Sequence, residues 1–227
     1  MTGQEARWSA RYREAGDDYL FGIEPSRFLS RRVDLFAQGH SALAVADGEG
    51  RNSVWLAEQG LAVTAVEISP VAVAKARKLA TVRGVPVAFA VADILSPDWP
   101  PPAMRGQFDW VVGIFIQFVG VEERLRQFAA MKEATRPGGR ILLHGYTPRQ
   151  LHYKTGGPSE LGNLYTAEIL QTAFSDWIME ELLEYEDEIE EGSGHRGRSA
   201  LIGMVAQKPA PAGTVGEAQQ RGGQVQT

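Results

Sequence analysis

A turn that contains two glycines stands between an apolar run and a helical stretch, and its residue types suit contact with a nucleoside. Gly48 and Gly50 lie in the run Ala-Asp-Gly-Glu-Gly at residues 46–50. Because glycine lacks a Cβ atom, the backbone can turn tightly there and approach a ligand closely. Glu67 ends the next apolar run, 19 positions after Gly48, where a carboxylate can accept hydrogen bonds from both ribose hydroxyls of an adenine nucleoside. A plain strand-to-helix turn beside an exposed glutamate is the alternative.

Asp93 and Ile94 follow a third apolar run and are expected at the same edge of the sheet. In an open parallel sheet, ligands bind outside the carboxyl ends of the strands. Asp93 could accept a hydrogen bond from an adenine amino group, and Ile94 and Ile68 could contact the ring. A cap of the following turn is an equally good interpretation of Asp93 alone.

Short β-like runs alternate with helix-like stretches through most of the chain, and this alternation defines the elements that must position these residues. The pattern predicts strands at residues 41–46, 61–68, 87–92, 108–115 and 140–145, and helices at residues 51–59, 122–135 and 165–174. A further helix is expected to begin at Pro70 after a Ser69 cap and to close at Gly84. The alternation indicates an α/β fold with a mostly parallel sheet and crossover helices.

The end of the folded region differs from this pattern. Residues 178–191 and 198–207 both resemble strands, and only residues 192–197 separate them. A connection this short predicts an antiparallel hairpin, since parallel strands need a longer crossover. Eight of the twelve residues from 180 to 191 are acidic, which we interpret as a solvated edge strand whose charges oppose aggregation.

Composition excludes several classes of protein. The chain has 227 residues, a net charge of −5 and no cysteine, which disfavours nucleic-acid partners and excludes thiolate metal sites and a cysteine nucleophile. Neither a secretory signal nor a membrane-spanning stretch is visible, so a cytoplasmic location is expected. Residues 208–227 contain no Leu, Ile, Met or aromatic residue and are expected to form a disordered tail after a single domain at residues 1–207.

Taken together, these motifs resemble class I S-adenosylmethionine-dependent methyltransferases. The resemblance covers about residues 40–207 and rests on the glycine turn, the acid that ends strand two, Asp-Ile after strand three, Phe-Asp at strand four, Pro-Gly-Gly before strand five and the final hairpin. It implies a three-layer, Rossmann-like, seven-stranded sheet, with residues 1–39 as a helical N-terminal cover. The runs at residues 19–29, 48–52, 146–158 and 194–197 resemble the small bacterial branch that includes tellurite-resistance and thiopurine methyltransferases.

The resemblance also implies where S-adenosylmethionine would lie. It places the methionine portion against the turn residues Ala46, Asp47, Gly48 and Gly50, the ribose on Glu67, the adenine near Ile68, Asp93 and Ile94, and the strand-four residues Ile114 and Phe115 beneath it. The turn departs from the family pattern, because Ala44 stands at the usual acidic position and Ala46 at the first glycine. Asp47 is the candidate that would hold the amino group of the cofactor instead.

The acceptor is expected to be a small molecule with a sulfur, selenium or tellurium centre, since a soft anion needs no strong general base. Its pocket should form where the N-terminal segment, the loop after strand five and the hairpin loop meet. The candidates to line it are Tyr19, Phe21, Gln117, Tyr146, Tyr153 and His195. Each could equally be a packing or surface residue. If a general base exists, His195 is the candidate, because an ordinary histidine pKa suits proton removal at neutral pH.

Three other functions stay open at this point. A small-metabolite oxygen or nitrogen methyltransferase is the nearest alternative. A nicotinamide-dependent oxidoreductase is disfavoured because Asn52 stands where the dinucleotide fingerprint has its last glycine or alanine. A non-catalytic S-adenosylmethionine-binding protein would share the motifs without turnover. The motif that nucleic-acid amino methyltransferases carry after strand four is absent, since Ile114 and Phe115 are followed by Ile-Gln. The sequence leaves the oligomeric state undetermined.

Overall fold

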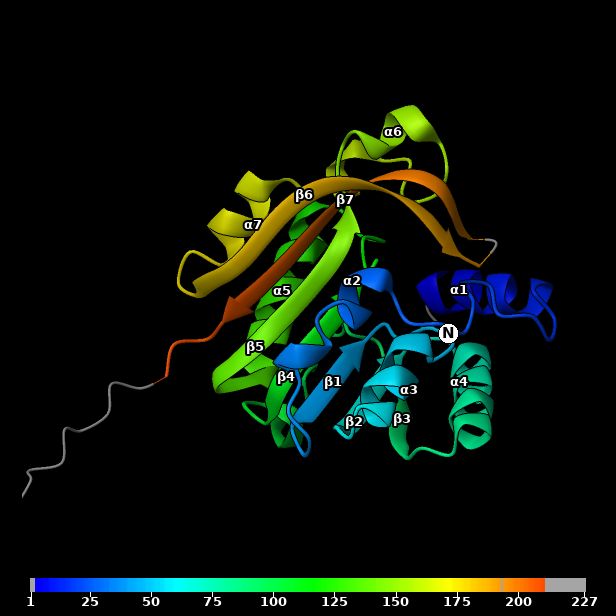
Figure 1. Ribbon diagram of the computed structural model, residues 1–227, viewed down its shortest axis with the longest axis horizontal. Helices are drawn as coiled ribbons and strands as arrows, with labels where there is room; N and C mark the ends of the chain where they lie inside the picture. Colours follow the sequence, from blue (N-terminus) through cyan, green and yellow to red (C-terminus); the bar gives the residue numbers. More distant parts are fainter. Residues whose placement is uncertain (1–2, 193, 211–227) are drawn as a thin grey trace, which may run out of the picture.

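The computed structural model describes residues 3–192 and 194–210. Their strands form one seven-stranded sheet with the order β3-β2-β1-β4-β5-β7-β6 (Figure 1). The strands are β1 (Ser41–Val45), β2 (Ala62–Glu67), β3 (Val87–Val91), β4 (Phe108–Ile114), β5 (Thr135–Tyr146), β6 (Ile178–Glu191) and β7 (His195–Gln207). β1 pairs in parallel with both β2 and β4, whereas β7 pairs antiparallel with both β5 and β6. The predicted fold class is therefore confirmed.

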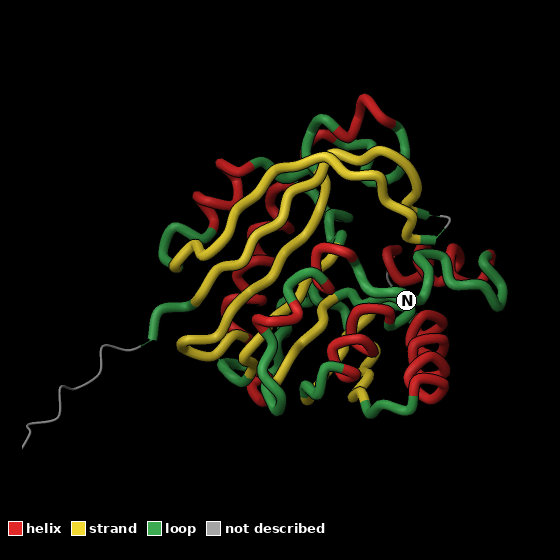
Figure 2. The backbone as a smooth tube through the Cα atoms, viewed as in Figure 1, coloured by secondary structure: helices red, strands yellow, loops and turns green. Residues whose placement is uncertain are grey.

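Helices cover both faces of the sheet and complete a three-layer structure (Figure 2). The helices are α1 (Gly3–Glu14), α2 (Arg27–Ser30), α3 (Arg51–Glu58), α4 (Pro70–Arg83), α5 (Val121–Ala134), α6 (Gln150–Tyr153) and α7 (Ala167–Ala173), with 3-10 turns at Val33–Leu35, Pro102–Met104 and Leu161–Asn163. Within the described residues, no helix is both long enough and apolar enough to cross a membrane.

The alternation of side chains along β1 explains why the core has two halves. Leu43 and Val45 pack on the face covered by α5 and α7, whereas Ala42 belongs to the cluster formed with α2 and α3. Successive residues of a strand point to opposite faces, so an apolar run such as this one is buried on both sides. The carboxyl end of β1 is consequently held rigidly between two packed layers.

The cap signals at α4 are as predicted. The Ser69 hydroxyl accepts a hydrogen bond from the Ala72 amide at 3.3 Å, Pro70 is the first helical residue, and Gly84 ends the helix with a φ of 69°. These signals are local, which is why the sequence alone was sufficient to place this helix.

The predicted starts of two strands, β5 and β7, were wrong. β5 begins at Thr135 and continues through Pro-Gly-Gly, because Gly139 accepts a hydrogen bond from the Lys208 amide at 2.8 Å. The same pairing shows that Lys208 continues the folded unit past residue 207, and residues 211–227 of the predicted tail lie outside the described residues. β7 begins at His195, so this histidine lies in a strand and not in the hairpin loop.

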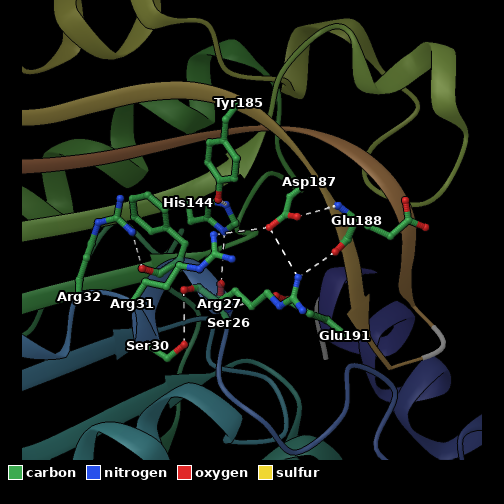
Figure 3. A network of polar contacts seen from close by, with 11 residues as sticks. Ser26, Arg27, Ser30, Arg31, Arg32, His144, Tyr185, Asp187, Glu188 and Glu191 are labelled. Carbon is green, nitrogen blue, oxygen red and sulfur yellow. Dashed lines mark hydrogen bonds and ion pairs between the residues drawn. The ribbon is translucent and has the colours of Figure 1, made fainter.

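β6 is an edge strand of the sheet, as predicted, and most of its acidic side chains are exposed or partly exposed, although several of them pair with arginines. Arg27 and Arg31 approach Asp187 at 3.7 Å each (Figure 3). The side chains of Arg27 and Arg31 are 57% and 63% exposed, so these are surface ion pairs, and they connect α2 to the hairpin. Elsewhere on the strand, Arg140 contacts Glu180 at 2.7 Å. The hairpin turn thereby lies beside the N-terminal segment, where the Gly194 amide donates to the Leu20 carbonyl at 3.0 Å (Figure 1).

Candidate active site

A cavity of about 470 Å³ opens at the carboxyl ends of β1, β2 and β4, where the strand order reverses. This switch point is where open α/β sheets bind ligands. The sequence-predicted residues that line it are Ala46, Asp47, Gly48, Glu67, Ile68, Asp93, Ile94, Ile114, Phe115, Phe21, Gln117, Tyr146 and His195. The predicted meeting point of the N-terminal segment, the loop after β5 and the hairpin is thus a real cavity.

The turn after β1 is held in an unusual backbone conformation. Ala46 and Gly48 have φ values of 48° and 62°, in the left-handed region that glycine adopts without strain. A Cβ atom on Gly48 would lie 2.9 Å from the Tyr12 hydroxyl, so only glycine allows α1 to approach the turn this closely. Gly50 was expected to face the cofactor, but it starts α3 and packs against α4, with Ala76 at 2.7 Å from the position of an added Cβ.

Glu67 joins the turn to the end of β2. Its carboxylate accepts hydrogen bonds from the Gly48 amide at 3.0 Å and from the Ser69 amide at 2.9 Å. Burial raises the pKa of Glu67, although these backbone hydrogen bonds oppose the effect. The side chain is buried at the floor of the cavity, where it fixes the turn and borders the space expected for the ribose.

Asp47 is also held at the turn. Its carboxylate accepts hydrogen bonds from the amide of Ser53, at 3.2 Å, and from the Ser53 hydroxyl. Burial raises the pKa of Asp47 to about 7, and the charge of Glu67 adds to the rise. Glu49 in turn raises the pKa of Glu67. Acids that oppose one another's ionisation at one end of a cavity favour a cationic ligand there.

The next wall of the cavity comes from the segment after β3. Asp93 caps the turn that follows, since its carboxylate accepts a hydrogen bond from the Leu95 amide at 2.9 Å. Ile94 is 95% buried, with 5% of its surface exposed, while Ile68 stays partly open to the cavity. The two isoleucines supply the apolar surface that a planar ring would need.

His195 lies at the opposite end among aromatic side chains. Its ring centroid is 4.5 Å from that of Phe21, 4.4 Å from that of Phe115 and 5.6 Å from that of Tyr146. Burial lowers the pKa of His195 to about 3, and the Arg51 and Arg11 guanidinium groups add to this effect. The imidazole is therefore neutral and weakly basic at neutral pH, and the reason for choosing it as a general base from the sequence does not hold.

Gln117 supports this end of the cavity by holding the backbone of Tyr146. Its side-chain amide donates to the Tyr146 carbonyl at 2.8 Å and accepts from the Tyr146 amide. Phe115, at the end of β4, has a φ of 56°, and strained residues of this kind gather at functional sites. The carboxyl ends of β4 and β5 are thereby locked side by side.

Two of the predicted acceptor residues lie outside the cavity. The Tyr19 hydroxyl donates to the Lys75 carbonyl at 3.3 Å, which places this ring against α4. Tyr153 ends α6, and the Arg198 guanidinium lies 5.6 Å from its ring centroid. Both belong to the correct segments, but their side chains are directed by contacts that a local pattern does not encode.

Sequence reasoning missed the contribution of α1. Trp8, Arg11 and Tyr12 line the cavity, and the Trp8 and Tyr12 rings stack with centroids 6.0 Å apart. Their spacing of four residues places them on one face of a helix. That aromatic stripe was the available signal for a helix that covers a ligand.

The run at residues 49–52 attaches other segments to the turn. Glu49 accepts from the Leu20 amide at 2.7 Å, and the Asn52 side chain accepts from the Ser26 amide at 3.0 Å. Arg51 forms a buried ion pair with Glu191 at 2.6 Å. These contacts hold the N-terminal segment and the hairpin over the cavity.

These residues fit S-adenosylmethionine. The backbone at Gly48 is open to a ligand because no side chain covers it. The acids around the turn suit the positive charges of a sulfonium and an ammonium group, and the two isoleucines suit the adenine ring. When bound, this cofactor would supply an activated methyl group.

Residues 42–139 match the family model described as methyltransferase domain, and no curated protein matches the chain. Many solved structures are similar to it, including the following three. A protein from work on the conversion of a disulfide bond into a thioacetal group during echinomycin biosynthesis has a TM-score of 0.76 and 19% identity, over 93% of this chain and 95% of that one. A SAM-dependent methyltransferase from Methanosarcina mazei has a TM-score of 0.65 and 18% identity, over 83% and 100%. TehB from Haemophilus influenzae has a TM-score of 0.63 and 20% identity, over 80% of this chain and 61% of that one.

The fold is that of the class I methyltransferases. Together with this fold, the family match identifies residues 42–139 as the methyltransferase domain of an enzyme that uses S-adenosylmethionine.

Proposed function

We propose that this enzyme methylates a small molecule at a sulfur, selenium or tellurium centre. The observation that carries the proposal is the acceptor end of the cavity, where aromatic rings surround a neutral histidine whose pKa is about 3. A site without an effective base at neutral pH suits an acceptor that is already ionised, such as a thiolate. Asp47, with its near-neutral pKa, lies at the other end and is held by Ser53.

Two resemblances support the same chemistry. The relative with a TM-score of 0.76 comes from work on a disulfide and a thioacetal, both of which are sulfur groups. The run at residues 48–52 resembles the tellurite-resistance and thiopurine branch. The size of the cavity also favours a small acceptor. The cavity has a volume of about 470 Å³, near the lower end of the roughly 300–1,000 Å³ found for pockets that hold one ligand. Cofactor and acceptor must share this space.

In this proposal the residues of the chain align and enclose the reactants. Asp47, Gly48 and Glu67 hold the amino-acid and ribose portions of the cofactor, and Ile68, Asp93 and Ile94 enclose its adenine. Ile114 and Phe115 form the floor beneath the cofactor, and Phe21 and Tyr146 exclude water from the acceptor. Alignment in a dry pocket accounts for much of the acceleration of a direct displacement.

Calorimetric titration with S-adenosylhomocysteine, with NAD as a control, tests the cofactor. We expect micromolar binding of the first and none of the second. Turnover is then measured with thiols, selenite and tellurite, and in parallel with phenols and amines. Methylation of phenols or amines but not of thiols, selenite or tellurite would replace the proposal with an oxygen or nitrogen acceptor. Binding without turnover of any acceptor would favour a non-catalytic binding protein.

A further inference from the structure

Two residues that line the acceptor end of the cavity each carry a buried polar atom without a hydrogen-bond partner. These atoms are the Tyr146 hydroxyl and Nδ1 of His195, and the two residues are only 1% and 8% exposed. A buried polar atom that lacks a partner costs about 1–3 kcal/mol. Both residues line the cavity, which makes a ligand bound there the candidate partner for these atoms.

The two residues border the same small space. A Cβ atom built on Gly156 would lie 3.5 Å from the Tyr146 hydroxyl oxygen and 3.6 Å from Cδ2 of His195. Phe115 packs against both rings, with centroids 4.6 Å from Tyr146 and 4.4 Å from His195. Hydrogen-bonding atoms set in an otherwise aromatic wall are the arrangement by which pockets orient a ligand.

The electrostatics of this end favour a negative ligand. Burial is the main cause of the lowered pKa of His195, and the positive charges of Arg51 and Arg11 lower it further. Arg51 is neutralised by Glu191 at 2.6 Å. Arg11 contacts the Trp8 and Phe21 rings, with its guanidinium carbon 4.8 Å and 5.8 Å from their centroids, and no acid pairs with it among the described residues. Burial also raises the pKa of Tyr146, so its hydroxyl stays protonated and can donate.

We propose that Tyr146 and His195 bind the reacting atom of the acceptor in its anionic form, as a thiolate or its selenium or tellurium counterpart, with the Tyr146 hydroxyl and the Nδ1–H group of the neutral His195 ring as the hydrogen-bond donors. This inference rests on the proposed function and names how its acceptor is recognised. A lone pair of the bound anion forms the new bond to the methyl carbon. The bond between that carbon and the cofactor sulfur breaks, and its electron pair stays on the sulfur. No proton moves within the site, so His195 is a binding residue and not a base.

The test uses 4-nitrothiophenol, a planar thiol whose ionised form absorbs visible light. Tyr146→Phe removes only the hydroxyl. Tyr165→Phe is a matched control, because Tyr165 is also 1% exposed and also has a hydroxyl without a partner, but it packs against Phe128 in the core, with centroids 5.6 Å apart. Neither substitution should lower the melting temperature, since each removes an unsatisfied buried group.

In the complex with S-adenosylhomocysteine, the wild-type protein should bind the probe as the thiolate and lower the pH at which it ionises. A hydrogen bond to a charged group contributes about 1.5–3 kcal/mol, so Tyr146→Phe should weaken thiolate binding about 10- to 100-fold and return the ionisation of the bound probe toward its value in water. Tyr165→Phe should bind like the wild type. Equal binding by the Tyr146 and Tyr165 variants would overturn the inference.

His195→Phe separates binding from base catalysis, because it keeps an aromatic ring in contact with Phe21 and Phe115. We expect a higher KM for the thiol and an unchanged shape of the dependence of kcat on pH. Loss of an ionisation from that pH profile would instead make His195 a base and refute the assignment. A wild-type protein that methylates no thiol, selenite or tellurite refutes the proposed function itself, whatever the variants do.

Discussion

Replacing Asp47 by asparagine should remove a loss of stability that the wild-type protein suffers as the pH rises. The Asp47 carboxyl accepts hydrogen bonds from Ser53 and has a pKa of about 7, raised by burial from 3.8. Asparagine has the same shape, can keep both contacts with Ser53 and does not ionise. The folded protein binds the Asp47 proton more tightly than the unfolded chain does, so stability falls between about pH 3.8 and about pH 7.

The magnitude follows from the difference in pKa. The pKa of Asp47 differs by about 3 between the folded and unfolded states, and each pKa unit corresponds to about 1.36 kcal/mol. The loss of stability over the full interval therefore has an upper limit of about 4 kcal/mol. Asp47 keeps partial exposure because it lines the cavity, and the remaining water contact reduces this figure. Between about pH 5 and about pH 8, we therefore expect Asp47→Asn to gain about 1–2 kcal/mol of unfolding free energy relative to the wild type.

Urea unfolding followed by tryptophan fluorescence, repeated across that pH range, measures this difference. Asp109→Asn is the control. Burial alone would raise the pKa of Asp109, but hydrogen bonds from Ser41 and Arg136 hold it at about 2. The ionised Asp109 carboxylate stabilises the folded protein above the unfolded pKa, and this stabilisation is lost only in acid. The Asp109→Asn variant should therefore lose the same amount of unfolding free energy at every pH from about 5 to about 8. A constant difference for Asp47→Asn as well would mean that Asp47 is already ionised in the folded protein, which would refute the reasoning.

Three further substitutions test the turn and its attachment, each by its effect on the free energy of unfolding. Ala46→Gly should stabilise the protein by up to about 1 kcal/mol, because φ is 48° there and a left-handed alanine is strained by about 1–2 kcal/mol; a loss of stability would show that the turn is unstrained. Gly50→Ala should destabilise it by at least about 2 kcal/mol, since its Cβ would lie 2.7 Å from that of Ala76 at a φ of 92°; a neutral result would contradict this packing. Arg51→Met leaves Glu191 buried and unpaired and should cost about 3–5 kcal/mol, most of it recovered in the double variant with Glu191→Leu; no recovery would mean that Glu191 finds another partner.

The sequence predicted the elements whose signals are local. The strand runs, the Ser69 cap and the two-glycine turn each depend on a few neighbouring residues, and all three were found where expected apart from the starts of β5 and β7. The antiparallel hairpin was also correct, because a short connection leaves no other geometry. The Pro-Gly-Gly run at residues 137–139 was misjudged as a break, since its backbone is drawn into β5 by pairing with Lys208, 69 positions from Gly139 in the sequence.

The side chains that surround the acceptor were harder to predict, because their directions depend on tertiary contacts. Tyr19 and Phe21 are two residues apart, yet Phe21 lines the cavity and Tyr19 turns toward α4. The pKa of His195 depends on burial among rings from three separate segments. No local pattern contains that information.

The run at residues 49–52 shows how one motif can be identified correctly and still have another role. Its residues resemble a cofactor fingerprint, but the side chains of Glu49, Arg51 and Asn52 bind the N-terminal segment and the hairpin. The hairpin carries His195, and the N-terminal segment carries Phe21. The turn expected to hold the methyl donor is therefore joined directly to both segments that form the acceptor end. Because one short run fixes all three, a change at Arg51 should disturb the alignment of donor and acceptor as well as the stability of the fold.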